Sequence, residues 1–156
     1  MNQSQKDLVP NLKQIIEKRI IKEEPSVGIY GWICITKTIP LEKGQSYYKI
    51  GNTGRLEAYL SKQKGQPIFL NDTPPLVLKV WGGASFFIKV IRRIFKDKRV
   101  ISFSGGASFF VLNDEDISWL SKIKIAKTAN IESEVYKIFD ETNPSFVTIL
   151  RREGLF

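Results

Sequence analysis

The stretch VGIYGWICITKT occupies residues 27–38, and YYKIG follows at residues 47–51. Both are rich in β-branched and aromatic residues, a composition typical of β-strands. The connection from Pro40 to Ser46 is polar and contains Gly44, as expected of a loop. We therefore expect the two stretches to pair as antiparallel neighbours through this loop.

Further elements follow on both sides of this strand pair. Apolar residues at helical spacing predict helices at residues 5–24, within 51–63, and at 84–96, 113–123 and 131–141. Short apolar and aromatic runs predict strands at residues 75–81, 99–103 and 109–112. Short strands interleaved with helices predict an α/β (α+β) fold, in which a small mixed or antiparallel sheet is flanked by helices.

The length of 156 residues corresponds to one ordinary domain with a single core. We divide the chain into an N-terminal helical arm at residues 1–25, a core domain at 26–123 and a C-terminal helical extension at 124–156. The hexapeptide GGASFF occurs twice, at 82–87 and 105–110, but the sequences around the two copies do not match. We therefore do not predict a repeat architecture.

Composition and charge limit the functions that the chain can have. It carries 24 Lys and Arg against 16 Asp and Glu, a net charge of +8, which favours a polyanionic partner. It has no His, which excludes Ser-His-Asp and Cys-His catalytic groups and His-ligated metal sites. Its single Cys predicts a reducing compartment, cytoplasmic or nuclear. No apolar run approaches the length that spans a bilayer, so no membrane partner is expected.

The two predicted strands carry a pair of tripeptides. Gly28-Ile29-Tyr30 opens the first strand, and Lys49-Ile50-Gly51 ends the second, with Thr53 two residues later. Their order, and the helix, strand and helix predicted after them, resemble the GIY-YIG nuclease superfamily. The similarity is greatest to its phage-type branch, in which KIG replaces YIG. The resemblance covers about residues 26–121, with Gly28 and Gly51 as the motif glycines.

The resemblance implies an endonuclease that hydrolyses phosphodiesters with one divalent cation. In the family, a strand Tyr helps to activate the attacking water, and an Arg on the first helix stabilises the charge of the phosphate. A Glu on a later helix is the protein ligand of the metal. On this chain, the resemblance makes Tyr30, Lys49 and Arg55 the candidate or remnant catalytic positions.

This sequence departs from the family pattern at two positions. Tyr59 stands where the Arg is expected, and Arg55 lies one helical turn earlier. The metal-binding Glu is expected near Ile88, but no Asp or Glu occurs between Thr73 and Lys96. Because Mg²⁺ prefers carboxylate oxygens, we predict a degenerate catalytic centre with no metal ligands.

Residues 84–96, ASFFIKVIRRIFK, carry a stripe of cations beside an apolar stripe. Like charges at this spacing destabilise a helix by a few tenths of a kcal/mol per pair, so their presence indicates an anionic partner. A solvated outer face is the alternative. We predict phosphate contacts from five cations of this region: Lys89, Arg92, Arg93, Lys96 and Arg99.

The sequence therefore predicts a nucleic-acid-binding protein with a catalytically degenerate GIY-YIG nuclease fold, and DNA is favoured over RNA as its partner. One alternative is an active endonuclease with a relocated acidic ligand, and only then is Mg²⁺ expected as a cofactor. A second alternative is a protein–protein interaction or inhibitor module. Trp32, Trp81 and Trp119 are interpreted as core residues rather than as residues that stack on bases.

Overall fold

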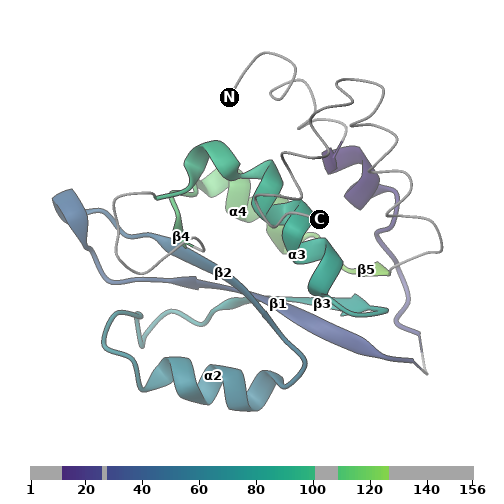
Figure 1. Cartoon of the computed structure of the whole chain (residues 1–156), viewed down its shortest axis with the longest axis horizontal. Coiled ribbons are helices and arrows are strands. Elements are labelled where there is room, and N and C mark those ends of the chain that lie inside the picture. Colours follow the sequence, from purple (N-terminus) through teal and green to yellow (C-terminus); the bar gives the residue numbers. More distant parts are fainter. Residues whose placement is uncertain (1–11, 26–27, 101–108, 127–156) are drawn as a thin grey trace, which may run out of the picture.

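The computed structural model of the chain describes residues 12–25, 28–100 and 109–126. Its centre is a five-stranded mixed sheet of order β4-β2-β1-β3-β5. The strands are β1 (Tyr30–Lys37), β2 (Tyr48–Thr53), β3 (Leu76–Trp81), β4 (Phe109–Phe110) and β5 (Ile125–Ala126). Helices α2 (Leu56–Lys64), α3 (Ser85–Ile94) and α4 (Asp114–Ser121) flank the sheet (Figure 1). The predicted fold class, a small mixed sheet flanked by helices, is confirmed.

Strand β1 lies between β2 and β3 and pairs antiparallel with both. The predicted pairing of the first two strands is therefore confirmed. The connection between them includes a short 3₁₀ turn, η1 (Glu42–Gly44). At the edges of the sheet, β4 pairs antiparallel with β2, and β5 pairs parallel with β3. The sequence did not predict β5, because a two-residue strand is too short to show a periodic pattern.

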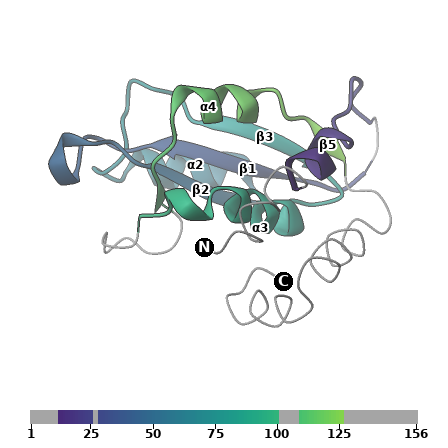
Figure 2. The same ribbon diagram turned by 90° about the horizontal axis from the view of Figure 1, so that it is seen from above.

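The two faces of the sheet are covered differently. Helices α3 and α4 lie over one face, and α2 lies over part of the other (Figures 1 and 2). Ile33 and Ile35 of β1 point to the first face and join Phe87 and Ile91 of α3 in the main core, all at 2% exposure or less. Because side chains alternate along a strand, Tyr30, Trp32, Cys34 and Thr36 point to the α2 face.

The N-terminal helix ends earlier than predicted. Residues 12–17 are helical, and Ile20 forms an isolated bridge with Ile125 instead of continuing a helix to residue 24. Leu12, Ile15 and Ile16 of this segment are buried in the main core. Ile20 fits the helical spacing of the apolar residues before it, but its backbone pairs with Ile125 as extended chain.

A capping box begins α4, as the predicted start at Asn113 requires. The Asn113 side chain accepts a hydrogen bond from the Asp116 N–H at 2.8 Å, and the Asp116 carboxylate accepts one from the Asn113 N–H at 3.0 Å. Asp116 also pairs with Lys98 of the 3₁₀ turn η2 (Lys96–Lys98), which follows α3. The helix predicted at 131–141 and most of the strand predicted at 99–103 lie outside the described residues.

Candidate nucleic-acid interface

The register of β1 separates the two tripeptides that indicated a nuclease site. Lys49 pairs with Thr36, whereas Tyr30 lies six residues earlier in β1. At about 3.3 Å per residue, this separation places Tyr30 and Lys49 roughly 20 Å apart. The structure does not bring these two residues together, and segment 34–36 is the part of β1 that lies opposite segment 49–51.

The position of the hairpin loop explains this register. The Thr38 N–H donates to the Tyr47 carbonyl at 2.8 Å and closes the hairpin, and pairing then continues outward to Trp32 and Thr53. The loop predicted from Pro40 to Ser46 already implies such a register, because the strands can only begin to pair beside it. The number of residues between the two tripeptides does not by itself show where pairing begins, so it did not predict their separation.

At the Lys49–Gly51 end, α2 and β1 are joined by a chain of neutral hydrogen bonds, one buried and one partly buried. The Thr36 hydroxyl donates to Gln63 Oε1 at 2.7 Å, and Gln63 Nε2 donates to the Tyr59 hydroxyl oxygen at 3.1 Å. A Cβ at Gly51 would overlap the Tyr59 hydroxyl, so only glycine permits this close approach. Tyr59, which stands where the family has Arg, therefore uses its hydroxyl to pack α2 on the sheet.

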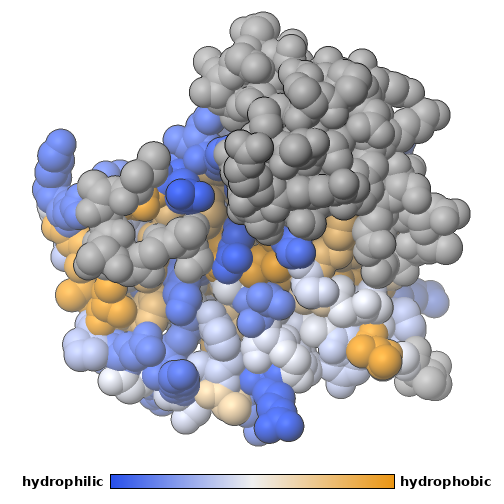
Figure 3. Space-filling view, in the orientation of Figure 1, coloured by the Kyte–Doolittle hydropathy of each residue, from blue (hydrophilic) through white to orange (hydrophobic). Residues whose placement is uncertain are grey.

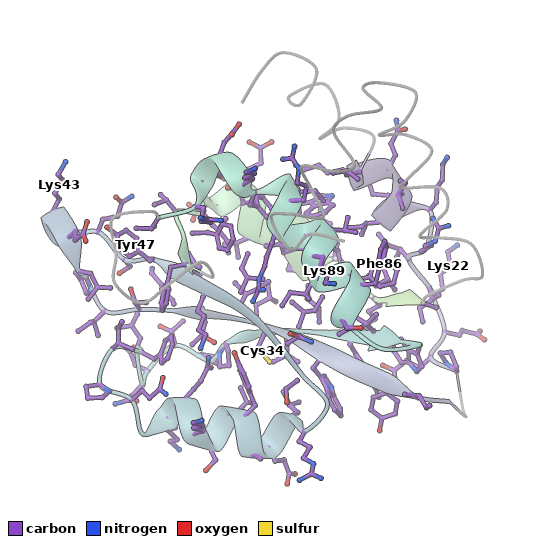
Figure 4. All side chains as sticks on the ribbon, viewed as in Figure 1. Lys22, Cys34, Lys43, Tyr47, Phe86 and Lys89 are labelled. Carbon is purple, nitrogen blue, oxygen red and sulfur yellow. The ribbon has the colours of Figure 1, made fainter. Side chains whose placement is uncertain are left out.

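Two ionisable groups beside this chain are held in their neutral forms. Cys34 lies between the sheet and α2 (Figure 4), and burial raises the pKa of its thiol to about 11. Burial also raises the pKa of Tyr59, with Cys34 adding to the rise and Arg92 opposing it. At neutral pH neither group is a thiolate or phenolate nucleophile.

The donor set at this end does not fit the metal that the resemblance implies. Around Gly51 the structure places hydroxyl, amide and thiol groups, whereas Mg²⁺ prefers carboxylate oxygens. In the described part of the chain, no group of three His, Cys, Asp or Glu residues is arranged to hold a metal ion. The residues around Gly51 therefore offer no set of ligands suited to Mg²⁺.

Two of the predicted phosphate contacts on α3 are taken up by the fold: Arg93 is buried, and Arg92 is partly buried and hydrogen-bonded to a strand. Arg93 is only 3% exposed. The Arg92 guanidinium donates to the Ile50 carbonyl from Nη2 at 2.7 Å and from Nε at 3.2 Å. This carbonyl lies at the edge of β2 beyond β4, which pairs only with Tyr48 and Lys49. Arg92 completes the hydrogen bonding of that edge and Arg93 is buried, which argues against phosphate contacts from these two residues.

The remaining predicted cations lie around α3 and η2. Lys89 and Lys96 are partly exposed, and Figure 4 shows Lys89 on α3. Arg99 is exposed and lines a surface cavity of about 770 Å³ together with Asp97 and Asn113. Phosphate contacts from Lys89, Lys96 and Arg99 stay predictions.

The other end of the α2 face carries a cluster that combines aromatic rings with a cation. Tyr30 pairs with Trp81, and Trp32 pairs with Lys79, so all four side chains share one face of β1 and β3. The rings of Tyr30 and Trp32 meet edge to face, with centroids 5.0 Å apart. Lys79 Nζ lies 4.2 Å from the Tyr30 ring centre and 5.2 Å from that of Trp81, within the range of cation–π attraction. We call these four residues the aromatic–lysine cluster.

Solvent reaches the aromatic–lysine cluster because α2 covers only the other part of this face. The β1 and β3 ends that carry the cluster extend past α2 (Figure 1). Tyr30 is 41% exposed, and its neighbour Ile29 is 81% exposed, whereas Trp81 is buried. Figure 3 shows a small hydrophobic patch at this end of the molecule, among hydrophilic and pale residues.

Arg55 provides a second cation at the same end. It lies two residues beyond Thr53, which pairs with Trp32, and it occupies the exposed N-cap position of α2. The Arg55 N–H donates to Thr53 Oγ1 at 3.0 Å, which fixes the turn between β2 and α2. Within the described segments the Arg55 guanidinium has no ion-pair partner, whereas Lys79 lies 4.0 Å from the Glu24 carboxylate.

Sequence reasoning did not find Lys79 or the cluster as a unit. The sequence did contain one indication of the cluster. Tyr30 and Trp32 are two residues apart, as are Lys79 and Trp81, and residues two apart in a strand lie on the same face. Which of these residues meet depends on the β1–β3 register, which no local pattern specifies. The interpretation of the tryptophans as core residues is confirmed for Trp81, whereas Trp32 and Trp119 are only partly buried.

Comparison of the chain with protein-family models, with curated proteins and with solved structures found no match. The described segments contain no helix that is both long enough and apolar enough to cross a membrane. The relationship to the GIY-YIG superfamily therefore stays a prediction that depends on the tripeptides and the order of the elements.

We predict that Gly51→Ala destabilises the fold through Tyr59. Forcing a methyl group against the Tyr59 hydroxyl should lower the free energy of unfolding by about 1–3 kcal/mol, measured by urea denaturation. The same substitution should cost less in a Tyr59→Phe background, which lacks the overlapping oxygen. The matched control is Gly54→Ala, because nothing lies within 4 Å of a Cβ at that position. Equal costs of Gly51→Ala in the two backgrounds would show that the two residues are not coupled.

Proposed function

We propose that this protein binds nucleic acid, with DNA favoured over RNA, on the open end of the sheet and does not cleave it. One observation carries the proposal: the aromatic–lysine cluster lies at a sheet end where Tyr30 is exposed and where Arg55 is also exposed. Cations neutralise phosphates, and aromatic rings beside them contact bases. The net charge of +8 adds a long-range attraction to any polyanion.

Binding without cleavage is favoured by the other end of the same face. There, Tyr59 replaces the expected Arg, and its hydroxyl is engaged with Gln63. Tyr30, which the resemblance makes the activating Tyr, lies roughly 20 Å from Lys49 by strand register. A site that stabilises the developing charge of a phosphodiester needs these groups around one phosphate.

If cations at the open end of the sheet contact phosphates, Arg55 and Lys79 should contribute to the affinity for DNA. The double variant Arg55→Glu/Lys79→Glu should bind a fluorescein-labelled 20-nucleotide DNA at least about tenfold more weakly than the natural chain, by fluorescence anisotropy. Lost phosphate contacts should also make the plot of log K against log salt less steep, by about 0.7 for each contact to single-stranded DNA.

The control for this experiment is Lys43→Glu. Lys43 lies at the far end of the β1–β2 hairpin (Figure 4). Its substitution by Glu changes the net charge of the protein but alters no residue of the aromatic–lysine cluster. The proposal is contradicted if the chain binds no DNA or RNA at low salt. It is also contradicted if Lys43→Glu weakens binding as much per charge as the double variant.

A cleavage assay tests the other half of the proposal. We expect supercoiled plasmid to stay intact when it is incubated with the protein and either Mg²⁺ or Mn²⁺, because the groups for phosphodiester hydrolysis are not assembled. The control substitution is Tyr30→Phe, which removes only a hydroxyl group. Metal-dependent nicking that Tyr30→Phe abolishes would establish the endonuclease alternative instead.

A further inference from the structure

We propose that the aromatic–lysine cluster binds an unpaired nucleobase, so that the protein prefers single-stranded to double-stranded nucleic acid. This inference rests on the proposed function and adds the class of substrate. It is carried by the arrangement of Tyr30, Trp32 and Lys79, which differs from that of a purely electrostatic surface.

The exposure of apolar side chains at this end indicates a binding surface. Only Ile20, Ile29, Tyr30 and Ile39 are exposed large hydrophobic residues in the described segments, and two of the four are adjacent here. Ile29 alone is 81% exposed. Scattered apolar residues need no explanation on a protein surface, but here Ile29 and Tyr30 are exposed at the strand end that carries the ring pair, which favours an interaction site.

The ring geometry fits a planar ligand. The planes of Tyr30 and Trp32 are nearly perpendicular, at 89°, so the two rings form a corner. A base that stacks on one ring presents its edge to the other ring. Lys79 lies over the Tyr30 ring, and Tyr30 is still 41% exposed, so part of this side chain is open to a ligand. Trp81, the register partner of Tyr30 in β3, lies buried on the same face of the sheet.

The cations beside the corner suit the phosphates of the same strand. Lys79 pairs with Trp32 on one side of β1. Thr53 pairs with Trp32 on the other side, and Arg55 lies two residues after Thr53. Tyr30 and Trp32 are two residues apart, about 7 Å along the strand, which corresponds to one or two nucleotides. The cluster therefore combines stacking on a base with phosphate contacts on either side of it.

A duplex cannot use the ring faces in this way. In double-stranded DNA each base is already stacked on its neighbours, and only its edges are accessible in the grooves. Stacking on Tyr30 or Trp32 therefore requires a base that is free of the duplex, and the energetic gain from stacking is available only to single strands or ends. A peptide would also contact apolar side chains, but the charge of the chain favours an anionic ligand.

Three labelled probes separate bases from phosphates: a dT12 strand, a 12-base-pair duplex, and a 12-unit abasic strand that has the same phosphates and no bases. Binding is measured by fluorescence anisotropy with the full chain. We expect dT12 to bind at least about tenfold more tightly than either of the other probes. Quenching of tryptophan fluorescence should accompany binding of dT12 but not of the abasic strand.

Variants assign the difference to the cluster. Tyr30→Leu and Trp32→Leu should each weaken binding of dT12 by roughly 5- to 100-fold and leave binding of the abasic strand unchanged. Tyr30→Phe, which keeps the ring, should bind dT12 within about twofold of the natural chain. The matched control is Tyr48→Leu, because Tyr48 also lies under a lysine, Lys37, but belongs to the opposite face of the sheet.

The outcomes distinguish this inference from the proposed function. If all three probes bind equally and Tyr30→Leu changes nothing, the stacking inference is overturned, whereas nucleic-acid binding stands. If no probe binds, both are overturned, and a protein partner becomes the better account of the exposed surface. If a leucine variant does not fold, the comparison of dT12 with the abasic strand on the natural chain still decides.

Discussion

The antiparallel register of β1 with both of its neighbours is the constraint on which the rest of the structure depends. It points Ile33 and Ile35 into the main core and leaves Cys34 and Thr36 on the α2 face. A shift of one residue would exchange these two sets and bury polar groups against α3. The burial of aliphatic side chains on one face therefore fixes which residues the other face can present.

The same register decides which chemistry is assembled. It places Tyr30 beside Trp81 and within reach of Lys79, and it moves Lys49 to the far end of the ladder. At that far end the close approach of the Tyr59 hydroxyl to Gly51 leaves a neutral, hydrogen-bonded junction between α2 and the sheet. One face of the sheet is thus divided into a packed half and an open half, and the open half carries the binding proposals.

Much of the fold could be predicted from the sequence, because local composition and spacing determine it. The strands at residues 30–37 and 76–81 and the capped start of α4 at Asn113 follow from strand propensity and from capping chemistry. The candidate site was harder to predict, because it depends on pairings between distant segments. Lys79 and Tyr30 are 49 positions apart in the chain, and only the β1–β3 register brings them together.

The α3 cations show a second limit of sequence reasoning. The spacing of apolar residues correctly predicted a helix at α3 with an apolar stripe. It could not show how much of the helix surface would be buried against the rest of the protein. Arg93 falls beside the apolar stripe and is buried, and Arg92 bonds to a strand carbonyl that β4 is too short to pair. A positive charge at helical spacing therefore does not by itself identify a binding surface.

The most direct test of the central claim, that nucleic acid binds the open end of the α2 face, is a nuclear magnetic resonance titration of the ¹⁵N-labelled chain with dT12. The three indole N–H signals report on separate places, since Trp119 lies on α4 and its indole N–H donates to Glu17. The account predicts that the signals of Trp32 and Trp81 and the amides of Tyr30 and Lys79 shift and saturate together, while the Trp119 signal stays in place. Shifts confined to α3, with Tyr30 and Trp32 unchanged, would contradict it.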